Sequence, residues 1–130
     1  ARQLPLPAEP HFLKSIKKIQ SDHLKAVRSN DFRSAFRLNI QFYHTLFGAC
    51  GNSCLAEVIK TLKMKSMAIK FFSFANHNLF QTSQKYHQLI IKAIDDKNRN
   101  SLVKICSELL EPCMEAYITE HQNLYGLGEN

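Results

Sequence analysis

The chain contains few of the residues that interrupt helices. Its 130 residues include only four glycines and four prolines, and most of these lie near the two ends. Because glycine and proline are the residues least favoured in a helix interior, the middle of the chain is free to form long helices. No apolar run reaches the roughly 18 residues that a membrane-spanning helix needs, and no signal peptide is expected. The sequence therefore predicts a cytoplasmic protein with no membrane partner.

Motifs of the common enzyme classes are absent as well. We find no nucleophile beside a general base at a recognisable spacing, no glycine-rich phosphate loop and no pair of carboxylates around a histidine. Asp95 and Asp96 are adjacent, and a solvated pair at a helix end explains them better than catalysis. The sequence predicts a protein that is not an enzyme.

The four cysteines lack the spacing of a zinc site. Three residues separate Cys50 from Cys54 and six separate Cys106 from Cys113, whereas zinc sites usually show close C-x2-C pairs. Each cysteine lies among apolar neighbours, so buried free thiols in a reducing compartment are the favoured interpretation.

The net charge of +6 raises the question of nucleic-acid binding. The basic residues are spread over several segments, with no arginine-rich run and no glycine–aromatic motif of an RNA-binding domain. A solvated helical surface is therefore favoured over direct binding of nucleic acid. The basic balance also suits an anionic small ligand or an acidic partner.

Apolar residues recur at three- and four-residue steps along most of the chain. The pattern predicts helices over residues 9–28 and 32–50, from residue 53, over about 82–95, and from about residue 99, with Pro112 bending or ending the last one. Residues 76–78 are expected to form a break, and a short strand at 69–74 stays open. The predicted class is all-α, an antiparallel helical bundle with short connections. Residues 1–10 are expected to be linker-like, 11–122 to form the helical domain and 123–130 a flexible tail.

Two polar turns are similar in sequence. Residues 26–36 and 93–103 each combine a helix end, a polar turn, an N-cap and a new helix with a small-then-large apolar pair. This pattern predicts the same hairpin chemistry used twice, not a repeat protein.

Residues 39–52 place polar groups on an apolar helix face. Asn39 and Tyr43 stand four residues apart and therefore share a face, which also carries Leu46 and Cys50. Polar groups on an inward face need partners, which are either structural or a ligand. The Gly-Asn pair that follows predicts a helix end and a cap for the next helix.

The order of these features resembles the C-terminal effector domain, of the FCD type, found in FadR-like regulators of the GntR family. The resemblance covers about residues 13–115, and the motifs that carry it are Ala26-Val-x3-Asp31, Asn39-x2-Phe42-Tyr43, Gly51-Asn52-x2-Leu55 and Tyr86-His87-x2-Ile90-x2-Ala93-Ile94. It implies an all-helical ligand-binding bundle that forms a homodimer and lacks the first helix of the family domain. It also implies a small organic-acid or acyl effector, and DNA binding only through a winged-helix domain that precedes the bundle.

Many members of that family bind a divalent metal. The resemblance places the four metal-binding positions at Asn39, Tyr43, His87 and Leu109, and only His87 keeps a side chain suited to a metal. A buried cation needs carboxylates or several imidazoles to offset its desolvation. No cofactor is therefore expected, and a divalent metal is disfavoured.

The same positions are candidates for direct effector binding. Asn39, Tyr43 and His87 offer an amide, a phenol and an imidazole to a carboxylate or carbonyl. Lys70 is a candidate source of positive charge, because it falls near a basic position of the family. The alternative is that the three polar side chains bond one another in a closed core, which would make the domain a helical protein–protein interaction module without a ligand.

Two further sets of residues complete the predictions. An aromatic cluster is expected to be core or dimer interface, or else a wall for an acyl chain; its members are Phe71, Phe72, Phe74 and Phe80. Four histidines have no companions at ligand spacing and are expected to be exposed or half-buried: His11, His23, His77 and His121.

Overall fold

The computed structural model describes residues 1–65, 77–109 and 111–125, and these residues form six helices without a strand. The helices are α1 (Pro10–Arg28), α2 (Phe32–Gly48), α3 (Ser53–Lys65), α5 (His77–Asp95), α6 (Arg99–Glu108) and α7 (Glu111–Tyr125). The predicted all-α class is confirmed. No described helix is long and apolar enough to cross a membrane.

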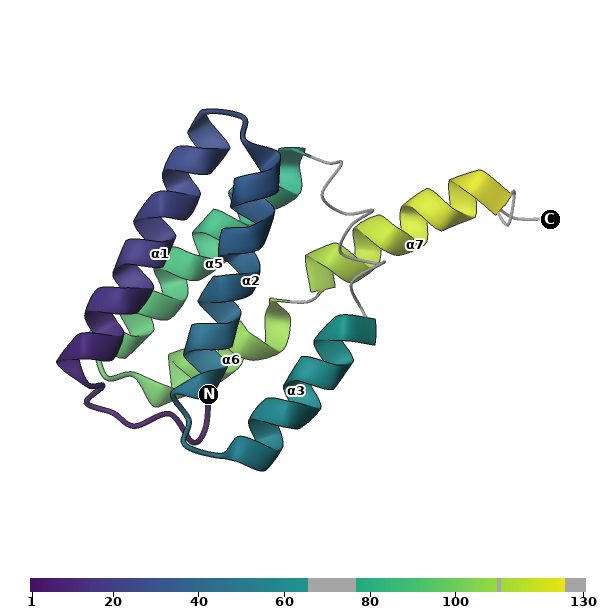
Figure 1. Cartoon of the computed structure of the whole chain (residues 1–130). Coiled ribbons are helices and arrows are strands. Elements are labelled where there is room, and N and C mark those ends of the chain that lie inside the picture. The colour runs from purple at the N-terminus through teal and green to yellow at the C-terminus, as the bar shows by residue number, and fades with distance from the viewer. Residues whose placement is uncertain (66–76, 110, 126–130) are drawn as a thin grey trace.

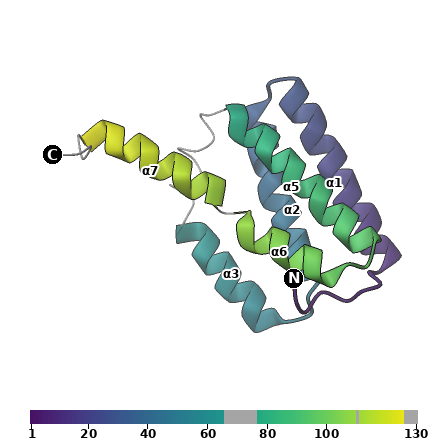
Figure 2. The ribbon, with the colours of Figure 1, turned by 180° about the vertical axis from the view of Figure 1, so that it is seen from behind.

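Three helices build the bundle. Helix α1 runs antiparallel to α2 and to α5, and the three lie side by side (Figure 1). Helix α6 folds back across the C-terminal end of α5. Helix α3 lies to one side and α7 extends away, as the view from behind also shows (Figure 2). The salt bridge between Lys17 Nζ and Asp95 Oδ2, at 2.8 Å, joins the first half of α1 to the end of α5.

The α1–α2 and α5–α6 hairpins close in the same way, as their sequences predict. Asn30 and Lys97 adopt left-handed conformations with φ of 56° and 55°. The following residue donates its N–H to a carbonyl five positions back, Asp31 to Ala26 at 2.9 Å and Asn98 to Ala93 at 2.8 Å. The Asp31 and Asn98 side chains then cap the next helix, each accepting an N–H from a serine three residues on.

The turn between α2 and α3 also follows its sequence. Gly51 has a φ of +70°, where a side chain would be strained. The Asn52 side chain accepts the backbone N–H of Leu55 at 2.9 Å and so caps α3. Asn52 additionally donates through Nδ2 to Gln3 Oε1 at 3.1 Å, which ties this turn to the N-terminal segment.

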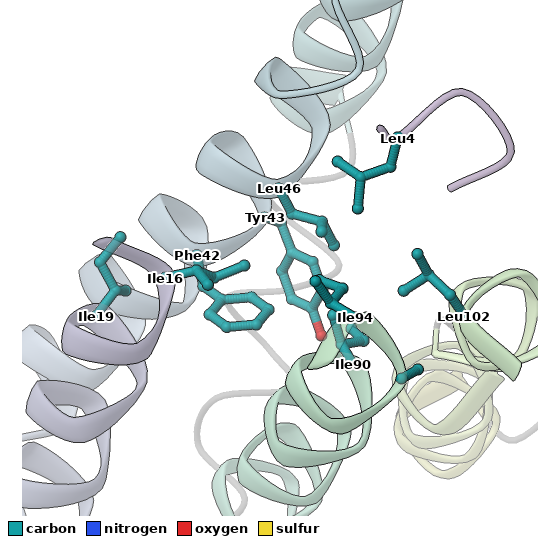
Figure 3. Packing of buried hydrophobic residues seen from close by; sticks show 10 residues of the cluster. Leu4, Ile16, Ile19, Phe42, Tyr43, Leu46, Ile90, Ile94 and Leu102 are labelled. Atoms are coloured by element: carbon teal, nitrogen blue, oxygen red, sulfur yellow. The ribbon is translucent and has the colours of Figure 1, made fainter. Parts of the chain in front are cut away.

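The N-terminal segment packs against the bundle and is not a free linker. Leu4 is 1% exposed and belongs to the main core cluster with residues of α1, α2, α5 and α6. Figure 3 shows its side chain above Leu46 and Tyr43 of α2. Arg99 donates from Nη1 to the backbone carbonyls of Ala1 and Arg2 at 3.3 and 2.6 Å. The prediction that residues 1–10 are linker-like is therefore wrong for the part that carries Leu4.

Helix α5 begins earlier than its sequence pattern suggests. The expected start was near Thr82, yet the helix begins at His77, so His77 and Asn78 are helical and not part of a break. The added turn carries Phe80, which is fully buried with Ala26, Val27 and Ala35 and stacks on Phe32 with ring centroids 5.3 Å apart. The core role expected of Phe80 is confirmed, because burial against the α1–α2 hairpin stabilises this turn.

The remaining predictions divide between confirmed, wrong and untested. Pro112 is the second residue of α7, after α6 has ended, as its position predicts. Cys50 and Cys106 are half-buried free thiols, but Cys54 is exposed. The other aromatic residues of the predicted cluster, Phe71, Phe72 and Phe74, and the open strand at 69–74 lie outside the described residues.

Replacement of the core leucine of the N-terminal segment tests its docking. For Leu4→Ala we expect the free energy of unfolding to fall by about 2–4 kcal/mol, because a buried isopropyl group is lost and a cavity remains. Urea denaturation measures this change. Arg2→Ala, which removes an exposed side chain two residues away, should change stability by less than about 0.5 kcal/mol. Equal effects of the two substitutions would contradict the docking of Leu4.

Candidate functional site

The bundle brings together three of the four predicted site residues. Asn39 and Tyr43 project from α2 and His87 projects from α5, and all three are buried. His87 Nε2 lies 2.9 Å from Asn39 Oδ1. The ring centroids of Tyr43 and His87 are 5.4 Å apart in an edge-to-face arrangement. Lys70, the fourth predicted residue, lies outside the described residues.

A second buried histidine completes the cluster. His23 of α1 is fully buried, and its ring centroid lies 4.8 Å from that of His87 at an interplanar angle of 62°. The prediction that His23 is exposed or half-buried is therefore wrong. The signal for its burial was present, because Ile19, His23 and Val27 share one face at four-residue steps. His11 is exposed as predicted. The side chains of His77 and His121 are not among those that the structure describes.

Aromatic packing holds the His87 ring in one plane. The ring stacks on Phe42 with centroids 3.8 Å apart and an interplanar angle of 17°. Phe42 is itself fully buried, and its own edge-to-face contact with Tyr43 has a centroid distance of 5.4 Å. Figure 3 shows Phe42 and Tyr43 reaching from α2 into the centre of the bundle. Phe42 covers one face of the His87 ring, so a polar group reaches His87 at the ring edge, where the two nitrogens lie.

Three of the four imidazole nitrogens have no hydrogen-bond partner among the described residues. His87 Nε2–H donates to the Asn39 amide oxygen, an atom that can only accept. His87 Nδ1 and both ring nitrogens of His23 are buried without a partner in the described part of the chain. A buried polar group left unpaired costs about 1–3 kcal/mol. The cluster therefore contains three buried nitrogens that lack hydrogen-bond partners among the described residues.

Both imidazoles are held in their neutral form. Burial lowers the pKa of His23 to about 4. The pKa of His87 is also well below its usual value, chiefly because of burial and secondarily because of the nearby His23. The described lysine, arginine and acidic side chains of α1, α2 and α5 are exposed or, for Asp22, half-buried. No described charged group is therefore buried beside the pair.

Residues 1–112 match the family model of the FCD domain. The chain belongs to the FCD family. FCD domains are regulatory ligand-binding domains of GntR-family transcription factors and are not an enzyme family. They bind small-molecule effectors and act together with DNA-binding domains. The match begins at residue 1, so the docked N-terminal segment lies within the family domain. Comparison with curated proteins and with solved structures gives no match.

The residues of this FCD domain do not fit a family-type metal site. At two of the positions that the family resemblance assigns to metal ligands, Asn39 and Tyr43 offer a neutral amide and a phenol, and the Asn39 amide is bonded to a ring nitrogen of His87. Leu109, at the C-terminal end of α6, is apolar and packs against the core cluster. No group of three or more His, Cys, Asp or Glu gathers among the described residues. A neutral amide and a leucine cannot offset the desolvation of a divalent cation.

The buried histidines predict acid sensitivity. Between about pH 6.5 and pH 4 the unfolded chain binds protons that the folded His23 does not, so stability falls as the pH falls through this range. His23 alone should contribute a loss of about 3 kcal/mol by pH 4, where its folded-state pKa lies. Urea denaturation at several pH values measures this loss.

Two histidine variants, one as the test and one as its control, accompany that measurement. His23→Phe should flatten the pH dependence, because an apolar ring of similar size has no proton to gain. His11→Phe changes an exposed histidine of the same helix and should leave the slope unchanged. A wild-type stability that stays constant between about pH 7 and pH 4 would contradict the burial of the neutral pair.

Proposed function

We propose that this FCD domain senses a small-molecule effector at the polar cluster of His23, Asn39, Tyr43 and His87. The observation that carries the proposal is the pair of fully buried histidines with three ring nitrogens unpartnered among the described residues. Buried polar groups in folded proteins are nearly always hydrogen-bonded. A ligand that forms hydrogen bonds to these nitrogens would supply the partners that they lack among the described residues. The same hydrogen bonds would stabilise the bound ligand.

The cluster is a poor match to a closed core. In a closed core the polar side chains would satisfy one another, and one such bond is present between Asn39 and His87. His23 and His87 have their rings edge to face, 4.8 Å apart, without a hydrogen bond between them. The helical interaction module without a ligand is therefore the weaker candidate, since it leaves these nitrogens unpaired at a cost in stability.

The position of the cluster suits signal transmission. A ligand there would contact α1, α2 and α5, and Tyr43 shares its core cluster with Leu4 of the N-terminal segment. The preference of the ligand for one packing of this core would shift the population of that packing. We propose that the shift reaches a winged-helix DNA-binding domain of the full-length regulator through the N-terminal segment, which Arg99 anchors at its first two carbonyls.

Effector binding should raise the melting temperature. We would screen small organic acids, amides, alcohols and acyl compounds by thermal shift, and a ligand at 100 times its Kd should add about 2.7 kcal/mol to the unfolding free energy. His87→Phe should abolish the shift for the compound found. His44→Phe changes an exposed histidine of α2, the helix that carries Asn39 and Tyr43, and should keep the shift. Absence of any shift, together with a crystal structure in which side chains fill the cluster, would favour the closed-core module.

We also propose that the domain forms a homodimer through the apolar side of α3. Leu55, Val58 and Leu62 follow one another at helical spacing and are 37, 56 and 60% exposed. Such a stripe on one helix is typical of a surface that another chain covers, and the family resemblance implies a dimer.

Sedimentation velocity tests the dimer. The wild-type domain should sediment as a dimer, and Leu62→Lys should shift it toward monomer because a charge would be buried in the interface. Lys60→Ala, two residues away on the same helix, should leave the dimer intact. A wild-type monomer at all concentrations, or a dimer unaffected by Leu62→Lys, would contradict this interface.

A further inference from the structure

The hydrogen bonds inside the cluster determine which chemical group an effector must present. This inference rests on the proposed effector site and concerns the chemistry of its ligand. The Asn39 Oδ1 atom accepts and cannot donate, so the 2.9 Å contact requires the proton of His87 to be on Nε2. Phe42 and Asn39 together fix both the plane of the ring and its tautomer.

The remaining nitrogen of His87 is then an acceptor only. In the neutral Nε2–H tautomer, Nδ1 carries a lone pair and no hydrogen. This atom is buried and unpartnered among the described residues. A hydroxyl or amide N–H can bond to it, and a carboxylate cannot, because a carboxylate has no hydrogen to donate. His23, also neutral, offers one donor and one acceptor on its two unpartnered nitrogens.

The described surroundings of the pair offer no positive charge to a carboxylate. Among the described residues, the polar groups in contact with the pair are the phenol of Tyr43 and the amide of Asn39, both on α2, and the two imidazoles contact each other from α1 and α5. The described charged side chains of the three helices point to solvent or, for Asp22 of α1, are half-buried. Asp22 bonds there to Lys18 and Lys25 at the surface. A carboxylate placed between the histidines would lose its hydration without gaining an opposite charge from a described residue.

We propose that the effector meets Nδ1 of His87 with a hydrogen-bond donor and is uncharged where it enters the His23–His87 pair. The favoured classes are a carboxamide, an alcohol or a protonated acid, each of which can donate to His87 and accept from His23. A free carboxylate, the group expected from the sequence, is disfavoured at this position. An effector that carries one holds it outside the pair.

Asn39→Asp is the substitution that should reverse this preference. It keeps the size and shape of the side chain and replaces the amide oxygen with a carboxylate, which favours a doubly protonated His87. Nδ1 of His87 then carries a hydrogen and becomes a donor. The variant should prefer a carboxylate over the matching amide. Gln41→Glu makes the equivalent change on the exposed side of the same helix and should leave the wild-type preference unchanged.

The test combines nitrogen-15 NMR of the histidine rings with two matched probe pairs, propionamide with propionate and benzamide with benzoate. At about pH 7.5, where free histidine is mostly neutral, wild-type His87 should show a protonated Nε2 and an unprotonated Nδ1. The amides should perturb the Nδ1 resonance of His87 and bind at least about tenfold more tightly than the carboxylates. In Asn39→Asp the order should reverse. EDTA is present throughout, so that the new carboxylate cannot act through a metal.

The outcomes separate this inference from the proposed function. Tighter binding of the carboxylates to the wild-type cluster, or a hydrogen on Nδ1 of His87, overturns the donor requirement and leaves the effector site standing. An unchanged preference in Asn39→Asp overturns the role given to the Asn39–His87 bond. Failure of every probe to perturb His87, in the wild type and in Asn39→Asp alike, overturns both the inference and the effector site.

Discussion

The hydrogen bond between Asn39 and His87 is the interaction on which the centre of this domain depends. It joins α2 to α5 in the interior, where the low dielectric strengthens a satisfied polar contact and penalises an unsatisfied one. It also assigns the proton of His87 to Nε2 and thereby makes Nδ1 an acceptor. The stacking of His87 on Phe42 keeps that acceptor in a fixed direction. One bond therefore both holds two helices and sets the chemistry of the buried edge.

The polar cluster is costly for the fold, and binding of the proposed effector would offset part of that cost. Two neutral imidazoles whose nitrogens lack partners among residues 1–65, 77–109 and 111–125 weaken the core, most of all at acid pH, because protons bind more tightly to the unfolded chain. A ligand that pairs these nitrogens would recover part of that stability. Tyr43 and Leu4 belong to one core cluster, so ligand binding would also stabilise the packing of the N-terminal segment. A core of leucine and phenylalanine alone would offer no such response.

Local chemistry made the hairpins and turns predictable from the sequence. Asp31 and Asn98 cap helices whose preceding residues adopt left-handed conformations, and both turns could be recognised from one shared pattern of ten or so residues. Gly51 and Asn52 likewise end one helix and cap another. The shared face of Asn39 and Tyr43 followed from their spacing. All these features depend on contacts between residues only a few positions apart, so the amino-acid sequence by itself determined them.

Tertiary packing decided the rest. The periodicity placed His23 on the apolar stripe of α1, but only the approach of α5 brought it to His87 and buried it. Leu4 has no helical period to reveal its burial, and its place in the core depends on a cluster with residues of α1, α2, α5 and α6. The first turn of α5 forms because Phe80 packs against the α1–α2 hairpin. Each of these outcomes rests on residues far apart in the chain, and local pattern carries no information about which distant surface a side chain will meet.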